Sequence, residues 1–309
     1  KIMKKGAKTM LWVLLWIVAV IVILILICFV YHRYRLKAEK KLREPLGQLV
    51  DINGNNMSIY VEGSGSRTLV FLSGSGTCSL LRDDYRIVVV EKFGYGYSDI
   101  VDEDRNIQTI LSETRLALNK AGIEGPYVLC PHSMSGIEAL YWAQKYPDEI
   151  EAIIGLDMAV PEYYENMKIN LALMKLGQYA ADLGITRLIP TLAESDAIKH
   201  GTLTNDEKNR YRAIFYNRTA TVTMINEAKS VKDNARIVAQ NGVPQVPMLL
   251  FISDGTGGTG FDKETWRRIQ EKYISEVESG KYIELDCPHY VHDYEYGRIS
   301  EEIKSFLSD

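Results

Sequence analysis

The sequence predicts an α/β protein with a mostly parallel sheet of about eight strands, a helical cap, and one N-terminal transmembrane helix. Three observations predict this architecture. Short apolar runs alternate with helical segments along most of the chain, which is typical of a parallel sheet covered on both faces. A stretch of about eighty residues, roughly 161–241, interrupts the alternation with mostly helical sequence. Finally, the 20 residues from Leu11 to Val30 carry no charge.

The composition is that of a globular protein with room for one large core. The 309 residues are 46% hydrophobic and 25% charged, with a net charge of −4. This balance gives no electrostatic footprint for nucleic acid. The four cysteines, at positions 28, 78, 130 and 287, show no CxxC spacing. We therefore expect no disulfide framework, no metal and no cofactor.

The charge-free stretch Leu11–Val30 is long enough to cross a bilayer. At about 1.5 Å of rise per residue, a helix of this length spans roughly the 30 Å hydrocarbon core. A cleavable signal peptide would have a shorter apolar region followed by small residues, whereas Tyr31, His32, Arg33 and Tyr34 follow here. We expect residues 1–44 to form a permanent single-pass anchor and residues 45–309 to form the folded domain.

Basic residues on the two sides of the span indicate its orientation. Four lysines precede it and six basic residues follow it, at positions 33, 35, 37, 40, 41 and 43. This difference favours a cytoplasmic folded domain. The segment 32–43 is expected to lie in the headgroup zone, where it would attract anionic lipid; the alternative is a solvated spacer helix.

The folded domain begins with a hairpin and continues with buried strands and helices. Gln48–Ile52 and Met57–Glu62 flank a polar turn, as in a β-hairpin. Further strands are expected at Thr68–Leu72, Tyr85–Glu91, Tyr127–Cys130, Ala152–Leu156, Val246–Ser253 and Lys281–Asp286. Helices are expected at Ile107–Ala121, after Ser133, and at Asp262–Ser275 and Glu295–Leu307.

The segment Tyr127–Pro147 has the pattern of a strand, a sharp turn and a helix, with Ser133 in the turn. A serine at such a place has its hydroxyl raised above the sheet, beside backbone N–H groups of the helix N-terminus. The usual G-x-S-x-G frame is replaced by Pro131-His132-Ser133-Met134-Ser135, with Gly136 next. The alternative is an ordinary turn in which Ser135 caps the helix.

From residue 48 onward the chain resembles the α/β-hydrolase superfamily. Four features coincide in the family's order: Ser73-Gly74-Ser75 in place of the oxyanion loop, the motif Phe93–Ser98 after a strand, the Ser133 turn, and Pro288–His292 in place of the histidine loop. The resemblance implies an eight-stranded α/β-hydrolase sheet with a cap at about 161–241. It also implies a serine nucleophile. A serine at this position argues against epoxide hydrolases and haloalkane dehalogenases, which would require aspartate there.

The resemblance implies roles for particular side chains. Ser133 is the expected nucleophile, with Ser135 as the alternative. A serine needs an adjacent base, and His289 is preferred over His292 because it directly follows the last strand. His132 is expected to support the turn.

A carboxylate must hold the base in the correct tautomer. We expect Asp254, at the end of the strand 246–253, and leave Asp262 and Asp157 as alternatives. Asp262 also has the pattern of a helix N-cap. The expected oxyanion donors are the backbone N–H groups of Ser75 and Met134.

The predicted function is a membrane-anchored serine hydrolase that cleaves an ester, thioester or amide of a small or lipid-like acyl substrate. The cap would wall an apolar acyl pocket with Tyr163, Tyr164, Met167, Met174 and Tyr179. The crossover at 75–84 is shorter than a parallel connection normally needs, which motivates a catalytically impaired scaffold or binding module as the alternative. A prolyl-type aminopeptidase, with acidic cap residues that reach a substrate amine, is a further alternative.

Overall fold

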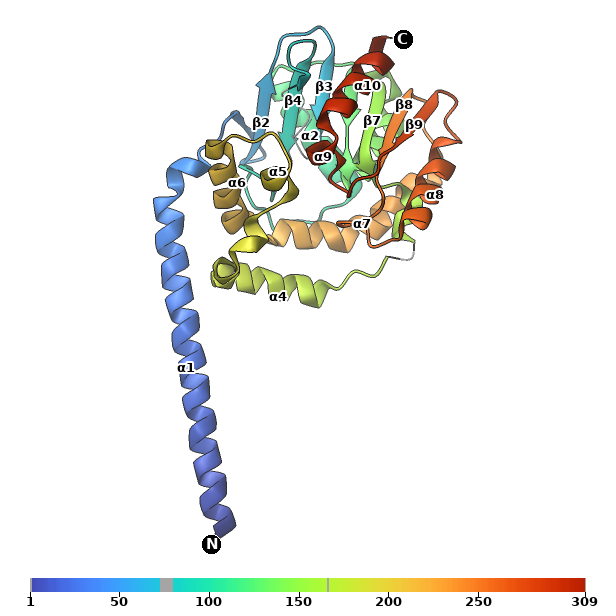
Figure 1. The fold of residues 1–309 in the computed structure, drawn as a ribbon. Helices are drawn as coiled ribbons and strands as arrows, with labels where there is room; N and C mark the ends of the chain where they lie inside the picture. The colour runs from blue at the N-terminus through green and yellow to red at the C-terminus, as the bar shows by residue number, and fades with distance from the viewer. Residues whose placement is uncertain (1, 73–79, 166, 309) are drawn as a thin grey trace.

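A long N-terminal helix leads into an α/β body, as the computed structural model in Figure 1 shows. The structure describes residues 2–72, 80–165 and 167–308. Helix α1 (Ile2–Ala38) stands away from the body for most of its length, and the short η1 (Lys40–Arg43) follows it. By length and composition, the part of α1 from Lys8 to Ala38 fits a membrane span or a signal sequence.

The body is built on one mostly parallel sheet, as predicted. Its strands are β1 (Gln48–Ile52), β2 (Asn55–Glu62), β3 (Thr68–Phe71), β4 (Arg86–Glu91), β5 (Tyr127–Cys130), β6 (His132–Ser133), β7 (Ile150–Met158), β8 (Met248–Ile252) and β9 (Gly280–Glu284). Their spatial order is β1-β2-β4-β3-β5-β7-β8-β9, and β6 pairs with β7. The first two pairings are antiparallel and the remaining ones are parallel.

Alternate residues of the central strands enter two separate cores, because successive side chains of a strand point to opposite faces. Val70 and Leu129 belong to the core on one face, and Phe71 and Val128 belong to the core on the other. The first core is covered by α2 (Ile107–Lys120), α3 (Ser135–Lys145) and α8 (Lys263–Ile274). The second is covered by α10 (Tyr296–Ser308) and by the turn before β4.

The cap lies between β7 and β8 in the chain. Its helices are η4 (Pro161–Tyr164), α4 (Leu171–Asp182), η5 (Ile185–Leu188), η6 (Pro190–Ala193), α5 (Asp196–Lys199), α6 (Asn205–Arg218) and α7 (Val222–Gln240). In Figure 1, α4 and α7 run one below the other across the lower side of the body, and α4 is the outer of the two. The short helix α9 (Val291–Tyr294) precedes α10.

The observed boundaries differ from the predicted ones where local chemistry interrupts a strand. Pro131 separates β5 from β6, because proline has no N–H to donate, although its carbonyl still accepts from Leu156 N at 2.9 Å. Strand β7 extends to Met158 and therefore includes Asp157. In the short crossover, residues 80–84 form a turn closed by hydrogen bonds to Leu81 O, and the rest of it lies outside the described residues.

Candidate active site

Ser133 lies in a strained turn between β6 and α3. Its φ of 53° is in the left-handed region, which a residue with a side chain seldom occupies. A hydrogen bond to the end of β7 holds the turn, because Ser133 O accepts from Ala159 N at 2.7 Å. Such strain in a turn between a strand and a helix is typical of functional turns.

Gly136 allows α3 to approach the end of β7. A Cβ added to Gly136 would lie 2.3 Å from Ala159 O, so any side chain there would collide with backbone. The glycine that the usual frame has at position 135 is thus displaced by one residue. Ser135 instead closes the turn, since its Oγ accepts from His132 N at 3.0 Å and donates to His132 O at 2.8 Å. These bonds give the alternative nucleophile a structural role.

His289 is hydrogen-bonded to Asp157. Their Nδ1 and Oδ2 atoms are 2.6 Å apart, and both side chains are buried. The other oxygen of Asp157 accepts from Ser253 N at 2.7 Å and from the Trp266 indole at 2.8 Å. The carboxylate of Asp157 thus has three hydrogen-bond partners, and in a neutral imidazole a proton on Nδ1 that is donated to Asp157 leaves Nε2 of His289 unprotonated.

Asp157 therefore occupies the position expected for Asp254. The carboxylate of Asp254 turns back to its own loop, where Oδ1 accepts from Thr256 N at 2.9 Å and from Thr256 Oγ1 at 2.6 Å. Asp262 caps α8 by accepting from Thr265 N at 2.9 Å, and this bond lowers the pKa of Asp262. The expected pairing of Asp254 with His289 is not found among these contacts. His289 is bonded to Asp157, whose carboxylate is also held by the backbone N–H of Ser253 at the end of β8.

Three histidines pack together next to the Ser133 turn. The ring of His132 lies 4.6 Å from that of His289 and 4.7 Å from that of His292, measured between centroids. Burial, followed by the charges of the neighbouring histidines, lowers the pKa of His132 well below its usual value, and burial and His289 lower that of His292 to about 4. Both shifts favour the neutral imidazole, and among the contacts of the described residues no carboxylate is bonded to the ring of His292 as Asp157 is to that of His289.

The serine and the histidine reach the same edge of the sheet, because His132 directly precedes Ser133 and contacts His289. No hydrogen bond joins Ser133 Oγ to His289 among the contacts of the described residues. Bonds of this kind often tighten only when substrate binds. Met134 is the N-cap of α3, where backbone N–H groups lack helical partners, and Ser75 lies outside the described residues.

A buried ion cluster joins α3 to the cap, and the sequence pattern did not predict it. Lys92, after β4, donates to Glu138 of α3 and to Glu227 of α7, and Tyr95 donates to Glu227 at 2.8 Å. Burial alone would lower the pKa of Lys92, but the two carboxylates outweigh burial and raise it. The cluster ties the cap to the nucleophile helix. In the sequence, the feature that could have indicated this cluster is a lysine directly after a buried strand.

A small cavity lies between α3 and α7. The cavity touches Met134, Glu138 and Glu227, and its volume of about 10 Å³ is room for roughly one water. Of the residues expected to wall an acyl pocket, Tyr163 donates to Thr259 O at 2.9 Å within an aromatic cluster and Tyr164 is buried beside it, whereas Tyr179 is exposed on α4.

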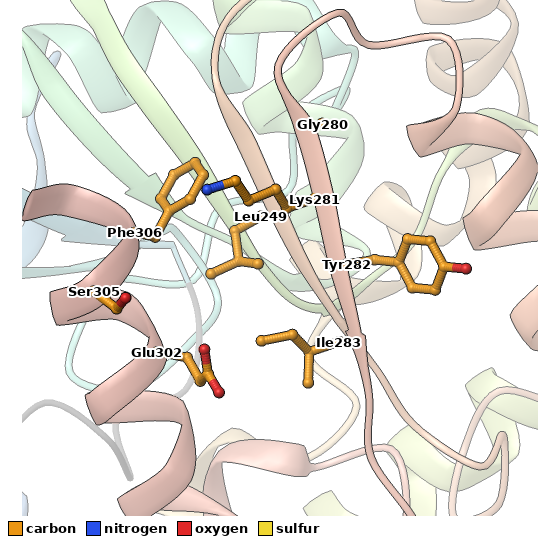
Figure 2. A pocket seen from close by; sticks show the side chains of 8 residues that line it. All are labelled: Leu249, Gly280, Lys281, Tyr282, Ile283, Glu302, Ser305 and Phe306. Carbon is orange, nitrogen blue, oxygen red and sulfur yellow. The ribbon is translucent and has the colours of Figure 1, made fainter. Parts of the chain in front are cut away.

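A larger hollow lies away from this edge. Figure 2 shows it between β9 and α10, with a volume of about 450 Å³. Its lining contains none of the predicted catalytic residues and consists of Leu249, Gly280, Lys281, Tyr282, Ile283, Glu302, Ser305 and Phe306.

Sequence comparison finds one relative along nearly the whole chain. The uncharacterized protein YbdG of Bacillus subtilis strain 168 is 33% identical over 296 residues, which cover 90% of this chain and 91% of that protein. An uncharacterized protein of Schizosaccharomyces pombe is 25% identical over 114 residues, or 36% of this chain and 21% of that protein. No protein-family model matches the chain.

Solved structures with the same fold are α/β-hydrolases. An epoxide hydrolase from Vigna radiata has a TM-score of 0.64 and 16% identity, covering 86% of this chain and 99% of that one. An esterase from Thermogutta terrifontis has a TM-score of 0.63 and 16% identity, covering 85% and 98%. An enol-lactonase from Burkholderia xenovorans has a TM-score of 0.61 and 16% identity, covering 85% and 100%. The predicted α/β-hydrolase fold is confirmed.

Proposed function

Because the chain belongs to the family of the Bacillus subtilis protein YbdG and has the α/β-hydrolase fold, we propose that it is a membrane-anchored serine hydrolase. Ser133 attacks an acyl carbon and His289 takes the hydroxyl proton, which it passes to the departing alcohol, thiol or amine as the acyl bond breaks. Asp157 orients His289 and stabilises its charged form. An ester, thioester or amide bond is cleaved through an acyl-enzyme on Ser133, which water then hydrolyses. The observation that carries the proposal is the buried pair of His289 and Asp157 beside a serine in a left-handed turn.

The oxyanion formed during this reaction needs fixed donors. The N–H of Met134 at the start of α3 is the donor that the described residues support, with Ser75 as the second by family resemblance. Helix α1 anchors the enzyme in a bilayer, with the folded domain on the cytoplasmic face. The length of α1 and the exposure of its apolar side chains support the anchor.

The two alternatives are distinguished by chemistry. An aminopeptidase would need a free acidic group of the cap near the nucleophile, but Glu227, the acidic cap residue that lines the cavity at Met134, is paired with Lys92. A scaffold without catalysis would retain the fold and lack a reactive serine.

The test is labelling of the full-length protein in detergent with a fluorophosphonate, which reacts with activated serines. We expect a covalent label on the wild type and on Ser135→Ala, and none on Ser133→Ala. Replacement of His289 by alanine should slow labelling by about 100-fold or more, since the serine loses its base. A label that persists in Ser133→Ala removes that serine from its role, and a folded wild type without any label favours the scaffold.

A further inference from the structure

The outer surface of the cap carries a run of exposed apolar side chains. On α4, residues 173, 176 and 179 recur at helical spacing and share one face. Further apolar side chains are exposed in the segment 188–192, which follows α4. The six side chains are 49% to 66% exposed, and they are Leu173, Leu176, Tyr179, Leu188, Ile189 and Leu192. Large apolar patches of this kind mark interaction sites on folded proteins.

This surface touches α1 at the end of the charge-free stretch. Gly184 joins α4 to η5, and a Cβ added there would lie 2.3 Å from His32 Cβ and 2.9 Å from Cys28 O. Cys28 precedes the last charge-free residue, Val30, by two positions. The cap therefore meets α1 at the level where a membrane helix leaves the hydrocarbon.

The direction of α4 fits a surface that lies flat on a bilayer. Figure 1 shows α4 crosswise to α1, and on the side of the body that faces the N-terminal half of α1. If α1 crosses the membrane near its normal, α4 runs along the membrane plane. Lys175 lies exposed on the same helix, so its amine can reach lipid phosphates while its stem stays among apolar groups.

The placement is held by a buried ion pair. Arg187 of η5 donates to both oxygens of Glu39, at 3.1 and 2.6 Å, and to Nδ1 of His32 at 3.0 Å. Its guanidinium also lies 4.1 Å from the ring centroid of Tyr216. Since α1 continues as a helix to Ala38, the cap is fixed to the anchor at a set height and does not hang on a flexible linker.

We propose that the outer face of α4 and the segment 188–192 lie in the interfacial zone of the bilayer that α1 spans. The occupant of this face is lipid, and the acyl substrate of the site is then membrane-resident. The inference rests on the membrane anchoring in the proposed function. The continuity of this face with the apolar helix favours lipid over a partner protein. Helix α7, which packs against α4, also lines the cavity at Met134.

The test measures lipid contact directly in the full-length chain. A fluorophore is attached to Leu176→Cys, in a background with Cys28→Ala and Cys78→Ala, because Cys130 and Cys287 are buried. The protein is placed in nanodiscs of phosphatidylcholine and phosphatidylglycerol with or without lipids that carry a nitroxide quencher. Tyr282→Cys, exposed on β9, is the matched control, and Val20→Cys on α1 reports membrane insertion.

We expect lipid nitroxides to quench the fluorophore at position 176 at least about two-fold more than at position 282, with strong quenching at position 20. Leu188→Cys gives a second reading, in case the first variant folds poorly. Quenching at 20 with equal, weak quenching at 176, 188 and 282 overturns the inference alone. If the same quenching pattern is found and unlabelled Leu176→Cys copies cross-link to one another, a second copy of the chain covers this face in place of lipid, and the inference is overturned. Absence of quenching at position 20 contradicts the anchor itself and thus the proposed function.

Discussion

Asp157 and Ser133 both occupy the left-handed region, with φ values of 51° and 53°. Each residue lies at the carboxyl end of a strand, where a turn of the backbone can direct a side chain over the sheet edge. For aspartate and serine this conformation costs energy that the surrounding contacts must offset. In Asp157 those contacts are the three hydrogen bonds to its carboxylate. The same hydrogen bonds therefore offset the backbone strain of Asp157 and hold the ring of His289.

Replacement of Asp157 by asparagine is expected to lower kcat by about 10³- to 10⁴-fold, because the amide no longer stabilises the protonated imidazole. Asp254→Asn should change kcat by less than about two-fold, since Asp254 contacts Thr256 in its own loop. Hydrolysis of a short p-nitrophenyl ester by both variants checks this. A large loss in Asp254→Asn with an active Asp157→Asn would reverse the assignment of the acid.

The sequence indicated Ser133 and His289 as candidates, because each follows a recognisable strand, and the structure brings their two segments to the same edge of the sheet through His132. It favoured Asp254 as the acid and left Asp262 and Asp157 as alternatives, and two of these three, Asp157 and Asp254, stand at the ends of adjacent strands. Leu156 of β7 pairs with Phe251 of β8, so Asp157 and Asp254 reach the same edge of the sheet. Which of them faces His289 depends on the positive φ of Asp157 and on donors from Ser253 and Trp266, which are tertiary features that no local pattern contains.

At the scale of elements, the nucleophile turn depends on the close approach of α3 and β7. The missing side chain of Gly136 makes this approach possible. The strands and helices of the body followed from apolar periodicity, because both cores are filled by alternate strand residues. The cap was predicted as helical but not in its short 3₁₀ turns, since such turns have little periodicity of their own.

Gly136→Ala should destabilise the protein by about 1–3 kcal/mol, because the new methyl group collides with Ala159 O. Gly177→Ala is the matched control within a helix, since a Cβ there meets nothing within 4 Å. That variant should gain about 0.5–1 kcal/mol from helix propensity. Thermal unfolding of the two variants should therefore shift in opposite directions. Equal shifts would show that the contact at Ala159 does not constrain the turn.

At the scale of the whole molecule, the contact between cap and anchor joins residues that are far apart in sequence. Arg187 and Glu39 are 148 residues apart, and their side chains are 5% and 9% exposed. Loss of one partner of a buried pair leaves an uncompensated charge, which costs far more than the loss of a surface pair. Glu39 keeps a second partner, Arg35 at 2.7 Å, which limits that cost.

Arg187→Gln is expected to destabilise the protein by about 3 kcal/mol. Arg236→Gln should change stability by less than about 0.5 kcal/mol, because Arg236 and Asp233 are 65% and 72% exposed. Thermal unfolding in detergent and limited proteolysis of the cap check both expectations. If the two variants melt at the same temperature, the contact does not secure the cap to α1.

The unbroken course of α1 from Ile2 to Ala38 gives the chain a fixed helical phase between its two ends. Each residue inserted into or deleted from the segment between His32 and Glu39 would turn Glu39 by about 100° about the helix axis relative to His32 and shift it by about 1.5 Å along that axis. After a single deletion, Arg187 could thus no longer contact both residues as it does now. Length changes that restore phase, of about seven residues for two turns, should be tolerated better than changes of one or two.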